Sequence, residues 1–109
     1  MFASVRLYTG LKDATVDAVG DRTTIIASLF AGVPGCVSAH VIRTREGLIV
    51  VIVGDEEAVI VEAGRRFVAW ANRNVPAFAG TASPTVWAGD VLLAPAVCLS
   101  TDDARATQP

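Results

Sequence analysis

Apolar and polar residues alternate along the first segment of the chain, residues 2–9 (FASVRLYT). One parity is apolar and the other carries polar or amphipathic groups: Ala3, Val5 and Leu7 against Ser4, Arg6 and Tyr8. A period of two is typical of a β-strand, because successive side chains of a strand point to opposite faces of the sheet. The pattern therefore predicts a strand with two unlike faces.

Two longer segments repeat their apolar residues with the period of an amphipathic helix. The first spans residues 13–31 and is followed by Gly32, Pro34 and Gly35, which end a helix, while Gly20 and Asp21 are positioned to interrupt it. The second spans residues 56–73. Their apolar stripes are Val16, Val19, Ile26, Ala27 and Phe30 in the first, and Ile60, Ala63, Phe67, Trp70 and Ala71 in the second.

Between the helices, residues 36–44 and 48–53 predict a β-hairpin that turns at 45–47. The run LIVVIV is apolar on both parities, which is typical of a strand in the centre of a sheet. After a connecting loop over 74–84, with a short helical turn expected around 76–78, residues 85–94 predict the last strand. We expect one domain over residues 1–97 and a disordered tail over 98–109, which is polar and rich in small residues.

The order βαββαβ predicts an α+β, ferredoxin-like fold, in which right-handed crossovers place both helices on one face of a four-stranded antiparallel sheet. The other face is left uncovered. We expect it to carry Arg6, Tyr8, Ser38 and His40 among apolar strands, a surface too hydrophobic to leave in water. The prediction is a homodimer in which two such faces pair into an α/β barrel.

Composition agrees with a partner subunit and narrows the function. The chain has 109 residues, of which 52% are hydrophobic and 18% charged, more apolar than an average domain. A net charge of −2 without a basic cluster argues against nucleic acid. The start lacks a signal-peptide pattern and no apolar run reaches bilayer length, so we expect a cytoplasmic protein without a membrane partner. Cys36 and Cys98 form no metal or disulfide motif.

Several short motifs, in order and spacing, give the chain a likeness to a known superfamily. They are Arg6-x-Tyr8 with Gly10, Val33-Pro34-Gly35-Cys36, Asp55-Glu56-Glu57-Ala58, Trp70, and Val86-Trp87-Ala88-Gly89-Asp90-Val91. Across residues 2–93 the sequence resembles the dimeric α/β-barrel superfamily, including antibiotic-biosynthesis-monooxygenase-like domains and their stand-alone relatives of unknown function. The resemblance implies the dimeric barrel. Haem-degrading proteins of this fold place a histidine on the second helix, and this chain has none there.

His40 and Arg6 are the candidate catalytic residues. His40 is the only histidine of the chain and can act as a general base if it faces a cavity. Its alternative is a solvated or hydrogen-bonded histidine at a dimer or hairpin surface. Arg6 can bind an anion through its fork of donors, and its alternative is an ion pair with an acidic residue such as Asp90.

The candidate substrate-binding residues are Tyr8, Ser38 and Trp87. Tyr8 can bind a phenolic or anionic ligand or fill the edge of the interface, and Trp87 can line the cavity, anchor the interface or belong to the core. Trp70 is expected in the core. No triad, paired-carboxylate or phosphate-loop motif is present, so hydrolase, kinase and dinucleotide-binding functions lack support.

Two functional hypotheses follow. The first is a dimeric α/β-barrel protein that binds a small hydrophobic or aromatic molecule under the sheet. The second, which rests mainly on the family resemblance, is a cofactor-independent monooxygenase acting on a phenolic or polyketide-like substrate, whose anion Arg6 or His40 stabilises. Both predict no cofactor and no metal.

Overall fold

The chain folds into a four-stranded antiparallel sheet with three helices, in a computed structural model that describes residues 1–75, 77–78 and 84–92. The elements are β1 (Phe2–Thr9), α1 (Asp13–Gly20), α2 (Thr23–Ala31), β2 (Cys36–Arg43), β3 (Gly47–Gly54), α3 (Glu57–Asn74) and β4 (Thr85–Asp90). The predicted α+β, ferredoxin-like fold is confirmed.

Differences from the predicted elements lie at their boundaries. The predicted interruption at Gly20 and Asp21 divides the first helical segment into α1 and α2. The last strand ends at Asp90, so it is shorter than the predicted 85–94. Residues 76 and 79–83 of the predicted loop over 74–84, and with residue 76 part of the helical turn expected around 76–78, lie outside the described residues, as does the whole predicted tail at 98–109. No helix in the described part of the chain is long and apolar enough to cross a membrane.

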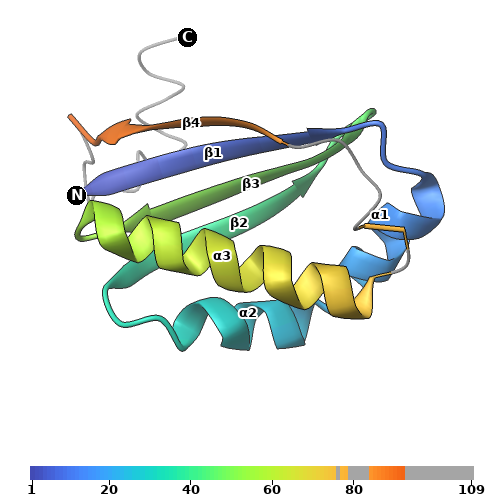
Figure 1. Ribbon diagram of the computed structural model, residues 1–109, viewed down its shortest axis with the longest axis horizontal. Coiled ribbons are helices and arrows are strands. Elements are labelled where there is room, and N and C mark those ends of the chain that lie inside the picture. Colours follow the sequence, from blue (N-terminus) through green and yellow to red (C-terminus); the bar gives the residue numbers. More distant parts are fainter. Residues whose placement is uncertain (76, 79–83, 93–109) are drawn as a thin grey trace, which may run out of the picture.

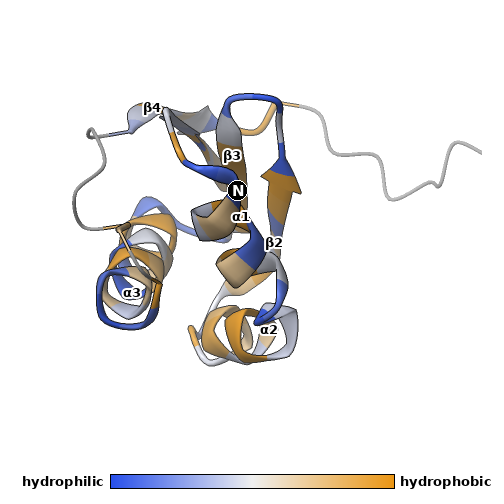
Figure 2. Cartoon of the chain, turned by 90° about the vertical axis from the view of Figure 1, so that its right-hand side faces the viewer, coloured by the Kyte–Doolittle hydropathy of each residue, from blue (hydrophilic) through white to orange (hydrophobic). Residues whose placement is uncertain are grey.

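The strands lie in the order β2-β3-β1-β4, and the helices all cover one face of the sheet (Figure 1). An end-on view shows α2 and α3 side by side beneath that face (Figure 2). β3 pairs with β2 on one side and β1 on the other, which confirms the prediction that the most apolar strand is central. In the described part of the chain, no helix lies over the opposite face of the sheet.

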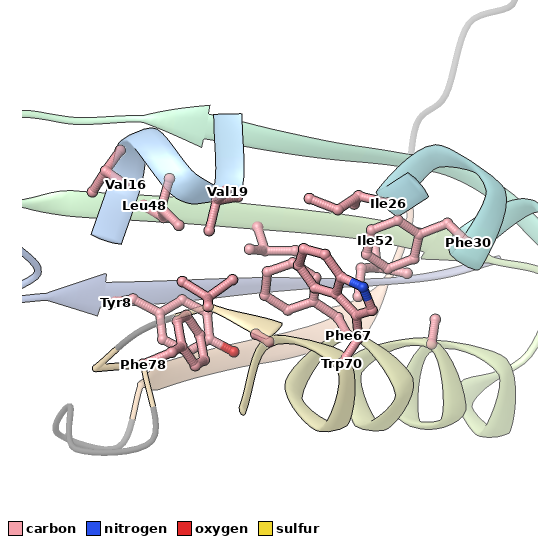
Figure 3. Close-up of a cluster of buried hydrophobic side chains, with 14 of the residues drawn as sticks. Tyr8, Val16, Val19, Ile26, Phe30, Leu48, Ile52, Phe67, Trp70 and Phe78 are labelled. Atoms are coloured by element: carbon pink, nitrogen blue, oxygen red, sulfur yellow. The ribbon is translucent and has the colours of Figure 1, made fainter. Parts of the chain in front are cut away.

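Phe67 of α3 is at the centre of the hydrophobic core (Figure 3). Its ring centroid lies 5.9 Å from that of Phe30 on α2, 6.3 Å from Tyr8 on β1 and 6.4 Å from Trp70 on α3. These separations are typical of packed aromatic pairs, which add to the free energy gained by burying the rings. Trp70 is 8% exposed, so its expected place in the core is confirmed.

The strand register decides which side chains face the helices. Tyr8 lies opposite Leu48 in the β1–β3 pair, and both are buried in the core. Because side chains alternate along a strand, Ser4 and Arg6 share the helix-facing side with Tyr8. The expectation that Arg6 and Tyr8 occupy the uncovered face is therefore wrong. The free energy gained by burying the rings of Tyr8 and Phe67 against each other outweighs the cost of placing the polar groups of this side of β1 beneath the helices.

The uncovered face carries the other parity of each strand. Val51 of β3 lies opposite both His40 of β2 and Val5 of β1, and Val5 lies opposite Trp87 of β4. Side chains directly opposite each other across neighbouring strands share a face, so these four residues form a row across the open face. Ser38 lies on the same face, opposite Val53. The prediction that Ser38 and His40 lie on the uncovered face is confirmed.

Candidate functional site

A cleft of about 330 Å³ lies between the helices α1 and α2 and the strands β2 and β3. Most of the residues that line it are apolar, and Thr23 and Arg43 are the polar ones. The full lining is Val16, Val19, Gly20, Thr23, Ile26, Ala27, Phe30, Ala39, Val41, Arg43 and Leu48. Glycine and alanine at three of these positions leave space that larger side chains would fill. The cleft has the size and the mainly apolar lining that are usual for sites of small organic molecules.

An ion pair joins the two sides of this cleft. Arg43 on β2 donates a 2.8 Å hydrogen bond to the Asp17 carboxylate on α1, and that bond raises the pKa of Arg43. Both side chains are exposed, and exposed pairs of this kind contribute about 0–1 kcal/mol. The contact therefore contributes little to the stability of the fold.

A second, smaller hollow of about 280 Å³ adjoins the cleft and shares Ala27, Phe30 and Ala39 with it. Cys36 and Ser38 border this hollow from β2, where a bulge lies between them, although the register of Ser38 places it on the open face. Burial raises the pKa of the Cys36 thiol above its usual value, so the thiol stays protonated at neutral pH. Of the residues predicted to bind substrate, Ser38 alone lies beside one of these two spaces.

A row of three polar side chains runs along the helix-facing side of β1. The Ser4 Oγ, the Arg6 Nε and the Tyr8 hydroxyl are all buried, and within the described residues none of these atoms is assigned a hydrogen-bond partner by distance and angle. Nearly all buried polar atoms in native proteins are hydrogen-bonded, so three unpaired atoms on one strand are exceptional. The alternative of an Arg6–Asp90 ion pair is wrong, because the register places Arg6 opposite Val86 and Asp90 opposite Phe2.

Burial raises the pKa of Tyr8, because desolvation disfavours the phenolate. The nearby Arg6 guanidinium opposes part of this rise, because its positive charge and its N–H donors favour the phenolate. The Arg6 guanidinium lies against α3 at Gly64, where a Cβ atom would overlap it. Tyr8 packs in the core between Phe67 and Phe78, so the alternative that it fills an interface edge is wrong.

The predicted site residues are thus divided between the two faces of the sheet. Arg6 and Tyr8 face the helices, whereas His40 and Trp87 stand on the open face with Ser38. Trp87 is 56% exposed, which excludes it from the core of one subunit. Sequence reasoning missed Ser4 and Gly64. Ser4 shares the parity of Arg6 and Tyr8, and Gly64 is a glycine inside an amphipathic helix, a position that often marks a close approach.

The residues of α3 do not fit a haem iron. The side chains that α3 buries against the sheet are Ile60, Ala63, Phe67, Trp70 and Ala71, none of which ligates iron. His40 lies on the opposite face of the sheet. Among the residues that the structure describes, no group of three or more His, Cys, Asp and Glu side chains is placed to hold a metal ion.

Comparison with solved structures tests the fold. The chain is similar to a mutant of MhuD with two manganese protoporphyrin IX molecules per active site (TM-score 0.65, 13% identity, 89% of this chain and 100% of that one). It is also similar to a mutant of SnoaB, a cofactor-independent oxygenase from Streptomyces nogalater (TM-score 0.61, 16% identity, 88% and 97%). A third similar structure is the monooxygenase ActVA-Orf6 of Streptomyces coelicolor with nanaomycin D (0.57, 15%, 85% and 92%).

The ferredoxin-like fold, which the chain shares with these three structures, is therefore confirmed. No protein-family model and no curated protein sequence matches it. At identities of 13–16% the three structures establish the shared fold and leave the activity to be argued from the chain's own residues.

Tyr8 is the only tyrosine of the chain, so its ionisation can be measured directly by absorbance at 295 nm. We expect a midpoint above the usual value near 10 in the folded protein and a return to about 10 in urea. The Arg6→Met variant should raise the midpoint further, because the guanidinium opposes the rise.

Because the pKa of Tyr8 is raised, the free energy of unfolding depends on pH. A raised pKa favours the neutral phenol in the folded state, so the stability due to Tyr8 is complete below pH 10 and is lost as the pH rises through the folded-state value. Circular dichroism at each pH separates ionisation from unfolding. A folded-state midpoint at or below 10 would contradict the burial of this hydroxyl.

Proposed function

We propose that this chain forms a homodimeric α/β barrel that binds a small hydrophobic or aromatic molecule in the cleft between the helices and the sheet, without a cofactor. The observation that carries the proposal is the mainly apolar space of about 330 Å³ lined by α1, α2, β2 and β3. Removing an apolar molecule from water into such a lining contributes roughly 25 cal/mol per Å² of buried surface. The proteins of the same fold that were crystallised with protoporphyrin and with nanaomycin D support a small-molecule ligand.

The dimer is proposed from the composition of the open face. Its inner positions are aliphatic, with Val5 and Leu7 on β1 and Val51 on β3, and Trp87 and Ile42 are 56% and 45% exposed. A face of this kind is expected to be covered by a complementary surface. An identical face on a second copy would supply one, since two-fold pairing buries the same patch on both subunits.

A cofactor-independent monooxygenase acting on a phenolic or polyketide-like substrate is the second candidate. The specific observation in its favour is the half-buried Arg6 side chain beside Tyr8, whose Nε has no partner among the described residues, because a guanidinium in a partly dry site can stabilise a substrate anion that reacts with oxygen. His40 would act as a base only from the interior of the barrel, since it lies on the open face. SnoaB, with the same fold, is a cofactor-independent oxygenase.

Filling the cleft should weaken ligand binding. Ala27 lines it from an exposed position of α2, so Ala27→Leu adds bulk to the cleft without disturbing the core. We expect binding of the neutral probe N-phenyl-1-naphthylamine, followed by fluorescence, to weaken by roughly tenfold, which is about 1.4 kcal/mol. Ala58→Leu, at an exposed position of α3, is the matched control. Equal binding by both variants would refute the cleft as the site.

Placing a charge at the centre of the open face should separate the subunits. Light scattering at micromolar concentration is expected to give twice the chain mass of 11.4 kDa for the natural protein, and the mass of one chain for Val51→Lys. The control Val61→Lys, on the exposed side of α3, should remain dimeric. A natural protein that scatters as a monomer contradicts the barrel.

Oxygen consumption with phenolic and polyketide-like substrates tests the second candidate. If Arg6 stabilises the substrate anion, Arg6→Ala should lower kcat by roughly 10²-fold, the usual cost of losing one anion-stabilising donor. A loss confined to His40→Ala would place the reaction inside the barrel. Consumption that neither substitution changes would remove both catalytic roles, and no consumption with any substrate would remove the oxygenase candidate.

A further inference from the structure

We propose that the apolar cleft binds an elongated amphipathic acid, a monocarboxylate whose chain lies along β2 and whose carboxylate meets Arg43. This inference rests on the proposed function, because it names the ligand class of the same cleft, and it does not depend on the dimer. Three features of the cleft carry it: the direction in which it runs, the charge in its lining, and the donors that this charge keeps free.

The cleft follows β2 along the strand. Its lining takes Ala39, Val41 and Arg43 from β2, and these alternate residues share the helix-facing side, since their partners on β3 are all buried. A strand rises about 3.3 Å per residue, so the floor of the cleft spans roughly 13 Å from Ala39 to Arg43. This floor is long enough for an extended chain to lie on it.

The two ends of this floor differ in polarity. At the Ala39 end the cleft adjoins the second hollow, and Phe30 borders both spaces. At the other end Arg43 lies opposite Leu48, which is near Val16 of α1 and well away from Phe30 (Figure 3). A few polar groups in an apolar lining fix the orientation of a bound molecule. The lining therefore suits a molecule that is apolar along its length and charged at one end.

The sign of the ligand's charge follows from the lining. Among the described residues that line the cleft, Arg43 is the one with a charge, and Thr23 adds a hydroxyl. The acidic residues that act on Arg43 are Asp17 and Asp13, and neither of them lines the cleft. A basic group in the cleft would meet a cation, whereas a carboxylate would meet hydrogen-bond donors.

Arg43 keeps donors for such a ligand. Its Nη1 donates to the Asp17 carboxylate at 2.8 Å, and no other hydrogen bond joins its side chain to the described residues. A guanidinium presents its N–H groups in a planar fork, so the edge formed by Nε and Nη2 can take a carboxylate while Asp17 stays in place. The Arg43 side chain is 54% exposed, so the acid group would lie at the mouth of the cleft and keep part of its hydration.

Titration calorimetry with octanoate and 1-octanol separates the charge from the chain, because the two probes share a carbon skeleton. An apolar cleft without a charge partner would prefer the alcohol, since a carboxylate loses more hydration on burial. We expect octanoate to bind the natural protein roughly fivefold more tightly, about the most that one partly solvated ion pair supplies. Equal affinity, a preference for 1-octanol, or no binding of either probe would overturn the proposal.

Substitutions at the ion pair test the role of Arg43. Arg43→Met keeps an apolar stem, so it should bind 1-octanol as before and lose the preference for octanoate. Arg45→Met, in the exposed connection between β2 and β3, is the matched control and should keep the preference. A preference that survives Arg43→Met, or that Arg45→Met also abolishes, would refute the contact.

Asp17→Asn removes the carboxylate that competes for the same guanidinium. We expect it to tighten octanoate binding severalfold and to leave 1-octanol binding unchanged. If the ion pair served only to hold α1 against β2, the substitution would weaken both probes together. That result, or octanoate binding that does not change, would contradict the proposal.

Chain length tests the direction of the ligand. Ala27 lines the cleft where it adjoins the second hollow, at the end away from Arg43. Ala27→Leu should therefore weaken binding of octanoate more than binding of pentanoate, because only the longer chain reaches this end. Arg43→Met should weaken both acids by the same factor. An equal loss of both acids in Ala27→Leu would contradict a chain that lies along β2.

Failure of this proposal is distinguishable from failure of the proposed function. If Ala27→Leu weakens binding of N-phenyl-1-naphthylamine but octanoate binds no better than 1-octanol, the cleft stands as an apolar site and the role of Arg43 falls. If Ala27→Leu leaves the neutral probe unaffected, the cleft itself fails as the ligand site.

Discussion

The aromatic contact of Phe67 with Tyr8 and Phe30 determines how the rest of the chain is arranged. It joins α3 to β1 and α2, and it requires the parity of Tyr8 to face the helices. Once that parity is set, antiparallel pairing assigns the parity of every other strand. This one contact thus determines which face of the sheet carries the cleft and the buried polar groups, and which face is mainly aliphatic and not covered by helices.

The sequence was sufficient to predict the fold class and the order of the elements. β3 is recognisable because it is apolar on both parities, and the helices because their apolar residues recur with a helical period. The break between α1 and α2 follows from Gly20, which weakens a helix, and the adjacent Asp21. These sequence patterns are local, so they can be recognised without knowledge of the tertiary contacts.

The candidate site was predicted less well, for a physical reason. On β1 both parities include residues that can be buried, and the period of two shows that two faces exist without showing which one the helices cover. Arg6 and Tyr8 look polar in the sequence, and yet α3 covers them because Gly64 leaves room for the guanidinium and Phe67 packs on the phenol ring. The cleft depends on small residues from different elements, Gly20, Ala27 and Ala39, whose proximity no local pattern reveals.

The two tryptophans of the chain lie on opposite sides of the sheet, Trp70 within the core and Trp87 on the open face. Indole emission shifts to shorter wavelength when water leaves its surroundings, so each ring is a natural optical reporter for one layer. Trp70 reports the integrity of the helix layer, and Trp87 reports whatever comes to cover the bare strands. A change in the helix layer and a change on the open face therefore alter the emission of different rings.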